Sequence, residues 1–163
     1  EFADFEQTWD VPLLNTCFEL PKLFCFAFFC APCFAYKQRS RLLDDDVENR
    51  YVCCAGQICG EHCNKVTDPC PQFCLCVEVC WCFWCAIGAN RSLMQQAYRI
   101  QNTWLENCMI WCACITSWIR CILSFFVDIP DVLDFILDCI YCIFQACLQS
   151  QQEHELDIRK PRV

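Results

Sequence analysis

The distribution of cysteine constrains the fold of this chain more than any other feature. The sequence has 21 cysteines in 163 residues, and many of them lie inside unbroken apolar runs. The stretch CPQFCLCVEVCWCFWCAIGANRS, from Cys70 to Ser92, has six cysteines in its first sixteen residues. Such thiols can form disulfides, bind a metal, or pack as small apolar side chains. Because the total is odd, one chain cannot pair all of them in disulfides.

Glycine content points to the fold class. The chain has only Gly56, Gly60 and Gly88, whereas a β-rich protein needs many turns and therefore many glycines. With 163 residues, 56% of them hydrophobic, the chain is long enough for one domain. We therefore expect residues 1–163 to form a single, all-α, cysteine-rich helical domain. The net charge of −8 makes nucleic acid an unlikely partner.

Two apolar segments precede the C-terminal third. Residues 23–36 carry no charge, and residues 73–89 carry only Glu78. Both are shorter than the roughly 20 residues needed to cross a bilayer. We expect them to be helices that dip into a membrane or lie at its surface.

The C-terminal third has the pattern of a helical hairpin. Residues 108–127 contain Arg120 as their only charge, and the sequence DIPD at 128–131 then interrupts the chain. Pro130 is suited to the start of a new helix. Residues 131–156 have helical periodicity, so we expect 108–127 and 131–156 to fold back as antiparallel helices. The polar stripe of the helix over 131–156 consists of Asp131, Asp134, Asp138, Cys142, Gln145, Gln149 and Gln152.

An arginine inside an apolar run needs a partner. With the turn centred near Ile129, Arg120 lies level with Asp138, so we expect a structural ion pair between them. The alternative is that Arg120 extends to a polar surface. Asp131, Asp134 and Asp138 also form an acidic stripe that could face a cation.

The charges around the hairpin bear on localisation. Its turn is acidic, and its two outer ends carry Arg91 and Arg99 on one side and Arg159, Lys160 and Arg162 on the other. Both basic ends would lie on the same side of a membrane, as the positive-inside tendency requires. We expect a plasma-membrane or organelle-membrane protein that contacts lipid. The alternative is a soluble helical domain with an aromatic core.

Residues 51–71 combine turn signals with thiols and predict an irregular, cysteine-rich loop. A loop with little apolar content needs disulfides or a metal to become ordered. His62 is a possible ligand, although an exposed loop histidine is the simpler interpretation. The loop candidates are Cys53, Cys54, Cys59, His62, Cys63 and Cys70.

The helical segments add further candidate ligands. In a continuous helix, Cys74, Glu78, Cys82 and Cys85 share one face. Thiolates prefer soft ions such as zinc; simple packing is the alternative. CxxC pairs occur at Cys30/Cys33, Cys82/Cys85 and Cys139/Cys142, and each is expected inside an apolar helix. The predicted metal ligands outside the loop are Cys30, Cys33, Cys74, Glu78, Cys82 and Cys85.

Three stretches resemble the placenta-specific 8 (cornifelin-like) cysteine-rich family, which includes plant cadmium-resistance proteins. They are FFCAPCFAYKQR, NRSLMQQAYRIQNTWLENCMIWCAC and CIYCIFQACLQSQQEHEL. The residues between the first two are most similar to a divergent plant and algal subgroup, and the resemblance covers residues 9–158. It implies membrane association, cysteine-dependent metal contact and oligomerisation. Here the first motif reads Cys30-Ala-Pro-Cys33 instead of Cys-Pro-Cys, and residues 115–138 form an insert.

The sequence shows no glycine-rich phosphate loop and no nucleophile elbow, so we do not expect an enzyme. We expect a metal-stabilised structural subunit of a homo-oligomer or larger membrane assembly, with zinc as cofactor and a possible role in metal-ion handling. One alternative is a divalent-cation transport or efflux component. The other is a disulfide-locked soluble or extracellular structural protein.

Overall fold

Helices dominate the structure, a computed structural model that describes residues 5–56, 69–123 and 131–160. The expected all-α fold is confirmed: the described strands are two residues each and pair in parallel. The elements are β1 (Gln7–Thr8), η1 (Leu13–Asn15), α1 (Thr16–Glu19), α2 (Pro21–Phe29), α3 (Ala31–Leu42), α4 (Val47–Arg50), η2 (Cys53–Gly56), α6 (Pro71–Trp81), α7 (Phe83–Tyr98), β2 (Ile100–Gln101), α8 (Trp104–Leu123) and α9 (Asp131–Arg159).

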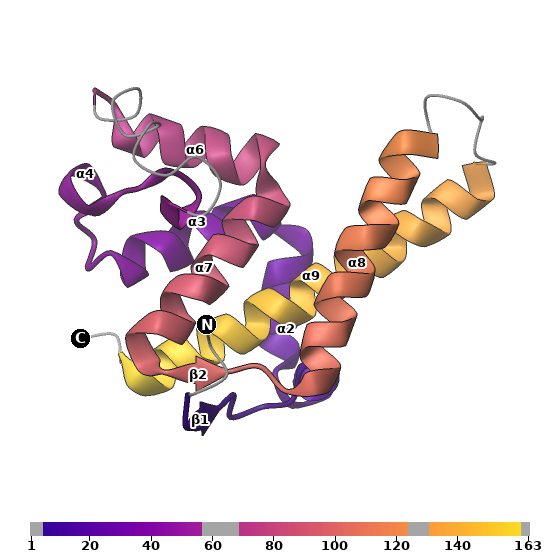
Figure 1. The fold of residues 1–163 in the computed structure, drawn as a ribbon, viewed down its shortest axis with the longest axis horizontal. Helices are drawn as coiled ribbons and strands as arrows, with labels where there is room; N and C mark the ends of the chain where they lie inside the picture. The colour runs from indigo at the N-terminus through magenta and orange to yellow at the C-terminus, as the bar shows by residue number, and fades with distance from the viewer. Residues whose placement is uncertain (1–4, 57–68, 124–130, 161–163) are drawn as a thin grey trace.

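Helix α9 is the element around which the body of the molecule assembles. Its C-terminal half passes through the body, where α2, α3 and α7 pack against it (Figure 1). Helices α3, α6 and α7 also contact one another and form a second core with Ala35, Leu75, Val79 and Ala86. The four-residue helix α4 packs beside α6. Helices α3 and α6, which are distant in sequence, therefore meet beside α7.

Two of the expected helices are interrupted. The segment predicted as one helix over 23–36 is α2 followed by α3, with a break at Cys30. The segment 73–89 is likewise divided at Cys82 between α6 and α7, which are bent by 114°. Both cysteines have nearly the same backbone angles, φ −125° and ψ 41° at Cys30 and φ −113° and ψ 42° at Cys82. The first cysteine of two CxxC pairs therefore lies at a helix junction, so the expectation of a continuous helix is wrong for Cys30/Cys33 and Cys82/Cys85. The third pair, Cys139/Cys142, lies inside α9 as expected.

The burial of α9 changes along its length. Its C-terminal half is buried on nearly every side, including polar residues such as Gln149 and Gln152. These residues are satisfied in part by distant partners: Gln38 donates to the Gln149 carbonyl and Arg41 pairs with Glu153 at 2.6 Å. The N-terminal half exposes its apolar residues instead. The predicted polar stripe thus points inward in the second half of the helix.

Helix α8 and the first half of α9 project from the body (Figure 1). They expose large apolar side chains: Trp111 is 68% exposed, Trp118 71% and Phe135 69%. The predicted turn at Asp128–Asp131 lies mostly outside the described residues. Within the described segments, no individual helix has both the length and the hydropathy of a membrane span, and only the bent pair α6 and α7 meets these criteria jointly.

Candidate metal centre

The centre of the body holds a buried carboxylate, Glu78, which is 4% exposed. Its Oε1 accepts a hydrogen bond from Arg39 Nη2 at 3.0 Å, and this arginine is itself 1% exposed. Its Oε2 accepts from the Tyr51 hydroxyl at 2.7 Å and from the Cys54 backbone N–H at 2.9 Å. Asn90 holds the arginine in place through a bond from Arg39 Nε to its Oδ1 at 2.5 Å. Arg39, the Tyr51 hydroxyl and the Cys54 N–H give the buried carboxylate the partners it requires.

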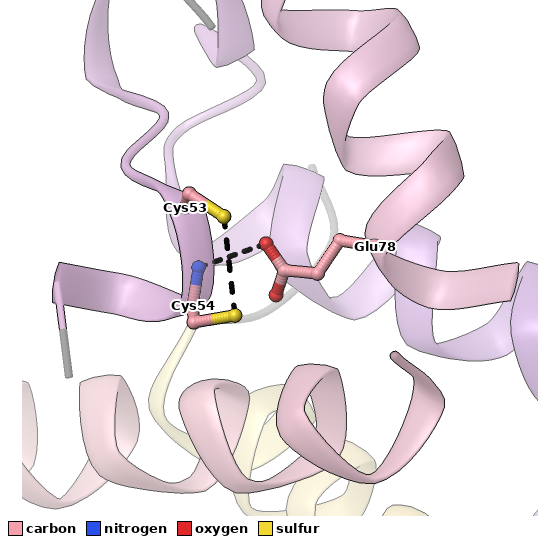
Figure 2. A group of neighbouring side chains, drawn as sticks. All are labelled: Cys53, Cys54 and Glu78. Atoms are coloured by element: carbon pink, nitrogen blue, oxygen red, sulfur yellow. Dashed lines mark hydrogen bonds between the residues drawn. The ribbon is translucent and has the colours of Figure 1, made fainter. Parts of the chain in front are cut away.

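The turn that presents Cys53 and Cys54 to this carboxylate has an unusual backbone. Cys54 and Ala55 have φ values of 49° and 52°, in the left-handed region that side chains with a Cβ rarely adopt. This conformation directs the Cys54 N–H toward Glu78 and leaves both thiols on the same side of the turn (Figure 2). Strained backbone of this kind typically costs about 1–3 kcal/mol and clusters at functional sites.

The two thiols and the carboxylate form a compact set of donor atoms. The Sγ atoms of Cys53 and Cys54 are 3.9 Å apart, and one Glu78 oxygen lies with them in a group whose members are all within 4.8 Å of one another. Two thiolates bound to one tetrahedral zinc ion at about 2.3 Å would be about 3.8 Å apart. Cys85, at the start of α7, is close enough to interact with the Cys54 thiol. The donors present are therefore suited to a soft divalent cation.

Burial sets the protonation state of this centre. It raises the pKa of the Cys54 thiol, and the charge of Glu78 and the neighbouring Cys53 raise it further. Burial also raises the pKa of the Tyr51 hydroxyl, helped by its hydrogen bond to Glu78. Without a cation both groups keep their protons, and Arg39 alone balances the charge of Glu78.

The structure brings only some of the other predicted ligands near this centre, Cys85 among them. Cys74 lies beside Cys53 and Cys70, and Cys70 is exposed at the start of α6. The 114° bend at Cys82 ends the helical face that Cys82 and Cys85 were expected to share with Cys74 and Glu78, so that expectation is wrong. Cys30 and Cys33 are exposed near the break between α2 and α3. Cys59, His62 and Cys63 lie outside the described residues.

Arg120 lies where the hairpin prediction placed it. Its Nη1 is 2.5 Å from Asp138 Oδ1, and its Nη2 is 2.6 Å from Asp134 Oδ1, a second partner that the prediction did not include. The pair is not buried as expected, because the Arg120 and Asp138 side chains are 25% and 58% exposed. Two members of the acidic stripe are thus neutralised, and Asp131 is exposed at the first turn of α9.

Sequence reasoning did not identify Arg39, Tyr51 or Asn90 as part of the site. Arg39 lies in the basic run KQRSR at residues 37–41, and nothing in that run distinguishes a buried counter-ion from an exposed arginine. Its distance from Glu78 in the chain, 39 residues, hides the pairing. The Cys53–Cys54 doublet was identifiable because adjacent thiols in a turn are natural metal ligands.

Comparison of the chain with protein-family models gives no match, and comparisons with curated proteins and with solved structures give none either. The resemblance to the placenta-specific 8 family therefore stays a prediction. The cysteines of residues 5–56, 69–120 and 131–160 are free thiols.

Proposed function

We propose that this chain is a non-catalytic structural subunit of a membrane assembly whose fold is stabilised by a zinc ion at Cys53, Cys54 and Glu78. The observation that carries the proposal is the 3.9 Å separation of two thiols beside a buried carboxylate. The ion would tie the η2 turn to α6, and through Arg39 to α3. Cys85 is the nearest described candidate for a further ligand.

Charge balance supports a divalent ion at this site. Zinc binding deprotonates both thiols, so two positive charges enter as two protons leave. Arg39 pairs with Glu78 at 3.0 Å and balances the charge of this carboxylate. A buried centre can accept the ion because its net charge does not change, and burying an uncompensated charge would be costly.

The exposed apolar surface supports placement in a membrane. Monomeric soluble proteins rarely expose large contiguous apolar patches, whereas α8 and the first half of α9 expose apolar residues on much of their surface. The pairing of Arg120 with Asp134 and Asp138 favours a structural role for this acidic stripe over cation transport. We therefore place these two helices in lipid or against a partner subunit embedded in it.

Elemental analysis tests the zinc proposal. The protein is purified, exposed to zinc and desalted, and zinc is measured per chain. We expect about one zinc ion per chain in the wild type, and loss of most of it in the double variant Cys53→Ser/Cys54→Ser. The matched control is Cys76→Ser/Cys80→Ser, which removes two exposed thiols from α6 and should retain the zinc. Equal zinc in all three proteins, or none in the wild type, would contradict the proposal.

A further inference from the structure

A second feature is an apolar pocket of about 450 Å³ between α7, α8 and α9, which borders the metal centre at Cys85. Each helix contributes residues at helical spacing, so the lining is one face of each. The walls are largely aliphatic and aromatic, with Trp84 and Phe144 stacked at 6.3 Å between ring centroids. Pockets of 300–1,000 Å³ with mostly apolar walls are typical of small-molecule sites.

Gly88 lines the pocket and contributes to its volume. It lies inside α7, where glycine costs about 1 kcal/mol relative to alanine. A Cβ added at this position would meet no atom within 4 Å. No neighbouring atom therefore requires glycine here, and its lack of a side chain enlarges the pocket.

The pocket's one charged lining residue, Arg91, is already neutralised. Arg91 donates to Gln151 Oε1 at 2.8 Å and to Asn102 Oδ1 at 2.7 Å, and Glu106 Oε2 is 3.7 Å away. Its guanidinium also lies 4.1 Å from the ring centroid of Trp9. Since these groups satisfy the arginine, the lining favours an uncharged hydrocarbon over an acidic ligand.

We propose that this pocket binds an acyl chain of a membrane phospholipid. Two of the three helices that form its walls, α8 and α9, also expose apolar side chains. Trp118 of α8 both lines the pocket and is 71% exposed, so the pocket is continuous with the surface that we place in lipid. The identity of this ligand therefore depends on the membrane placement in the proposed function. The existence of the pocket does not depend on it. A chain bound here would fill the space between α7 and α8 and fix α8 against the body.

Photolabelling in a bilayer tests this inference. The full chain is reconstituted in phosphatidylcholine vesicles containing phosphatidylcholine with a diazirine in one acyl chain, and the labelled residues are mapped by mass spectrometry. We expect adducts at Ile87, Ile110 or Ala113 in the pocket, and also at the exposed Ile119 on α8. The variant Gly88→Leu fills the pocket and should reduce the pocket adducts at least tenfold. The control Ala97→Leu adds the same side chain at an exposed position of α7 and should leave them unchanged.

The two sets of adducts separate failure of this inference from failure of the membrane placement. Adducts at Ile119 with none in the pocket, or pocket adducts that Gly88→Leu does not reduce, would overturn the acyl-chain site while keeping the membrane placement. Absence of both sets would overturn both. Cross-links between the Cys114 thiols of two chains, formed by a short bis-maleimide, would show that a second copy fills the pocket instead. Circular dichroism confirms that each variant is folded.

Discussion

At the scale of single residues, Glu78 has a structural role that does not depend on metal. It is the counter-ion of buried Arg39, and removing one member of a buried pair leaves the other uncompensated. We predict that Arg39→Leu lowers the free energy of unfolding by about 3–5 kcal/mol, measured by urea unfolding in the presence of a chelator. Arg50→Leu is the control because its pair with Asp44 is exposed, and it should cost about 1 kcal/mol or less. Similar losses in both variants would show that the Arg39 pair is not buried in solution.

The raised pKa of Cys54 predicts how zinc affinity depends on pH. If zinc binds here, it binds thiolates and releases the proton of each thiol ligand, and burial makes the Cys54 proton harder to remove. We predict that zinc affinity falls by about two orders of magnitude per pH unit between pH 8 and pH 6. Competition with a chelating dye, corrected for the dye's own protonation, measures this. An affinity independent of pH over this interval would exclude thiolate ligands.

The raised pKa of Cys54 also predicts that the metal-free protein becomes less stable as the pH rises in the alkaline range. A thiol whose folded pKa exceeds its unfolded value of about 9 stabilises the fold below that pH. The contribution is lost as the pH rises further, because the unfolded chain ionises first. We predict that the unfolding free energy of the chelated protein decreases above about pH 9, and that Cys54→Ser weakens this decrease. An unchanged slope in Cys54→Ser would assign the trend to other groups.

The left-handed backbone at Ala55 predicts a stabilising substitution. Glycine adopts φ near 52° without the steric cost that a Cβ imposes. We expect Ala55→Gly to raise the free energy of unfolding by about 0.5–1 kcal/mol. Ala97→Gly is the control, since at an exposed helical position in α7 glycine should destabilise by about 1 kcal/mol. Destabilisation by both variants would argue against the strained turn.

At the scale of elements, α2–α3 and α6–α7 are built in the same way. Each pair begins with a proline, Pro21 or Pro71, and breaks at a cysteine that starts a CxxC sequence. Nine residues after each break lies a buried arginine, Arg39 or Arg91. Each arginine reaches a carboxylate on another helix, Glu78 or Glu106. The bend turns each second helix inward, which explains how charged residues of both enter the core.

Arg120 of α8 pairs with Asp134 and Asp138 of α9. Because this cluster is exposed, mutating it should have a small effect on stability. Exposed ion pairs are worth about 0–1 kcal/mol, and Asp134 can pair with Arg120 if Asp138 is lost. We predict that Asp138→Leu alone changes stability by less than about 1 kcal/mol in detergent. In the double-mutant cycle with Arg120→Leu, the coupling energy should be similarly small. A coupling of several kcal/mol would show that lipid or a partner buries the cluster.

The sequence predicted the helical class, the long helix beginning at Asp131 and three members of the candidate centre. It did not predict the bend at Cys82, because no proline or glycine marks that position. Pro32 lies two residues after the other break, at the start of α3, and is a usable signal. The inward direction of Gln149 and Gln152 also could not be read from periodicity, which gives a stripe but not what the stripe faces.

At the scale of the whole molecule, the exposed apolar surface determines where the protein can reside. We predict that the wild type floats with phosphatidylcholine vesicles in a density gradient. Trp111→Arg combined with Ile119→Arg should reduce flotation severalfold, because charged side chains are costly in hydrocarbon. Both residues are more than half exposed, so the fold should be retained. Gln96→Arg, at an exposed position on α7, is the control, and equal flotation of all three proteins would contradict the assignment.

The central position of α9 has a consequence for biogenesis. The other elements it packs against, including α2, α3 and α7, precede it in the chain, and its buried glutamines bond to groups as far as 140 residues away. During synthesis these earlier helices emerge from the ribosome before the segment that completes their core. Contacts of such high sequence separation form slowly, so the nascent chain would display open apolar surface until α9 arrives. A chaperone or an insertion factor that holds the chain during this interval is therefore expected to set the yield of folded protein.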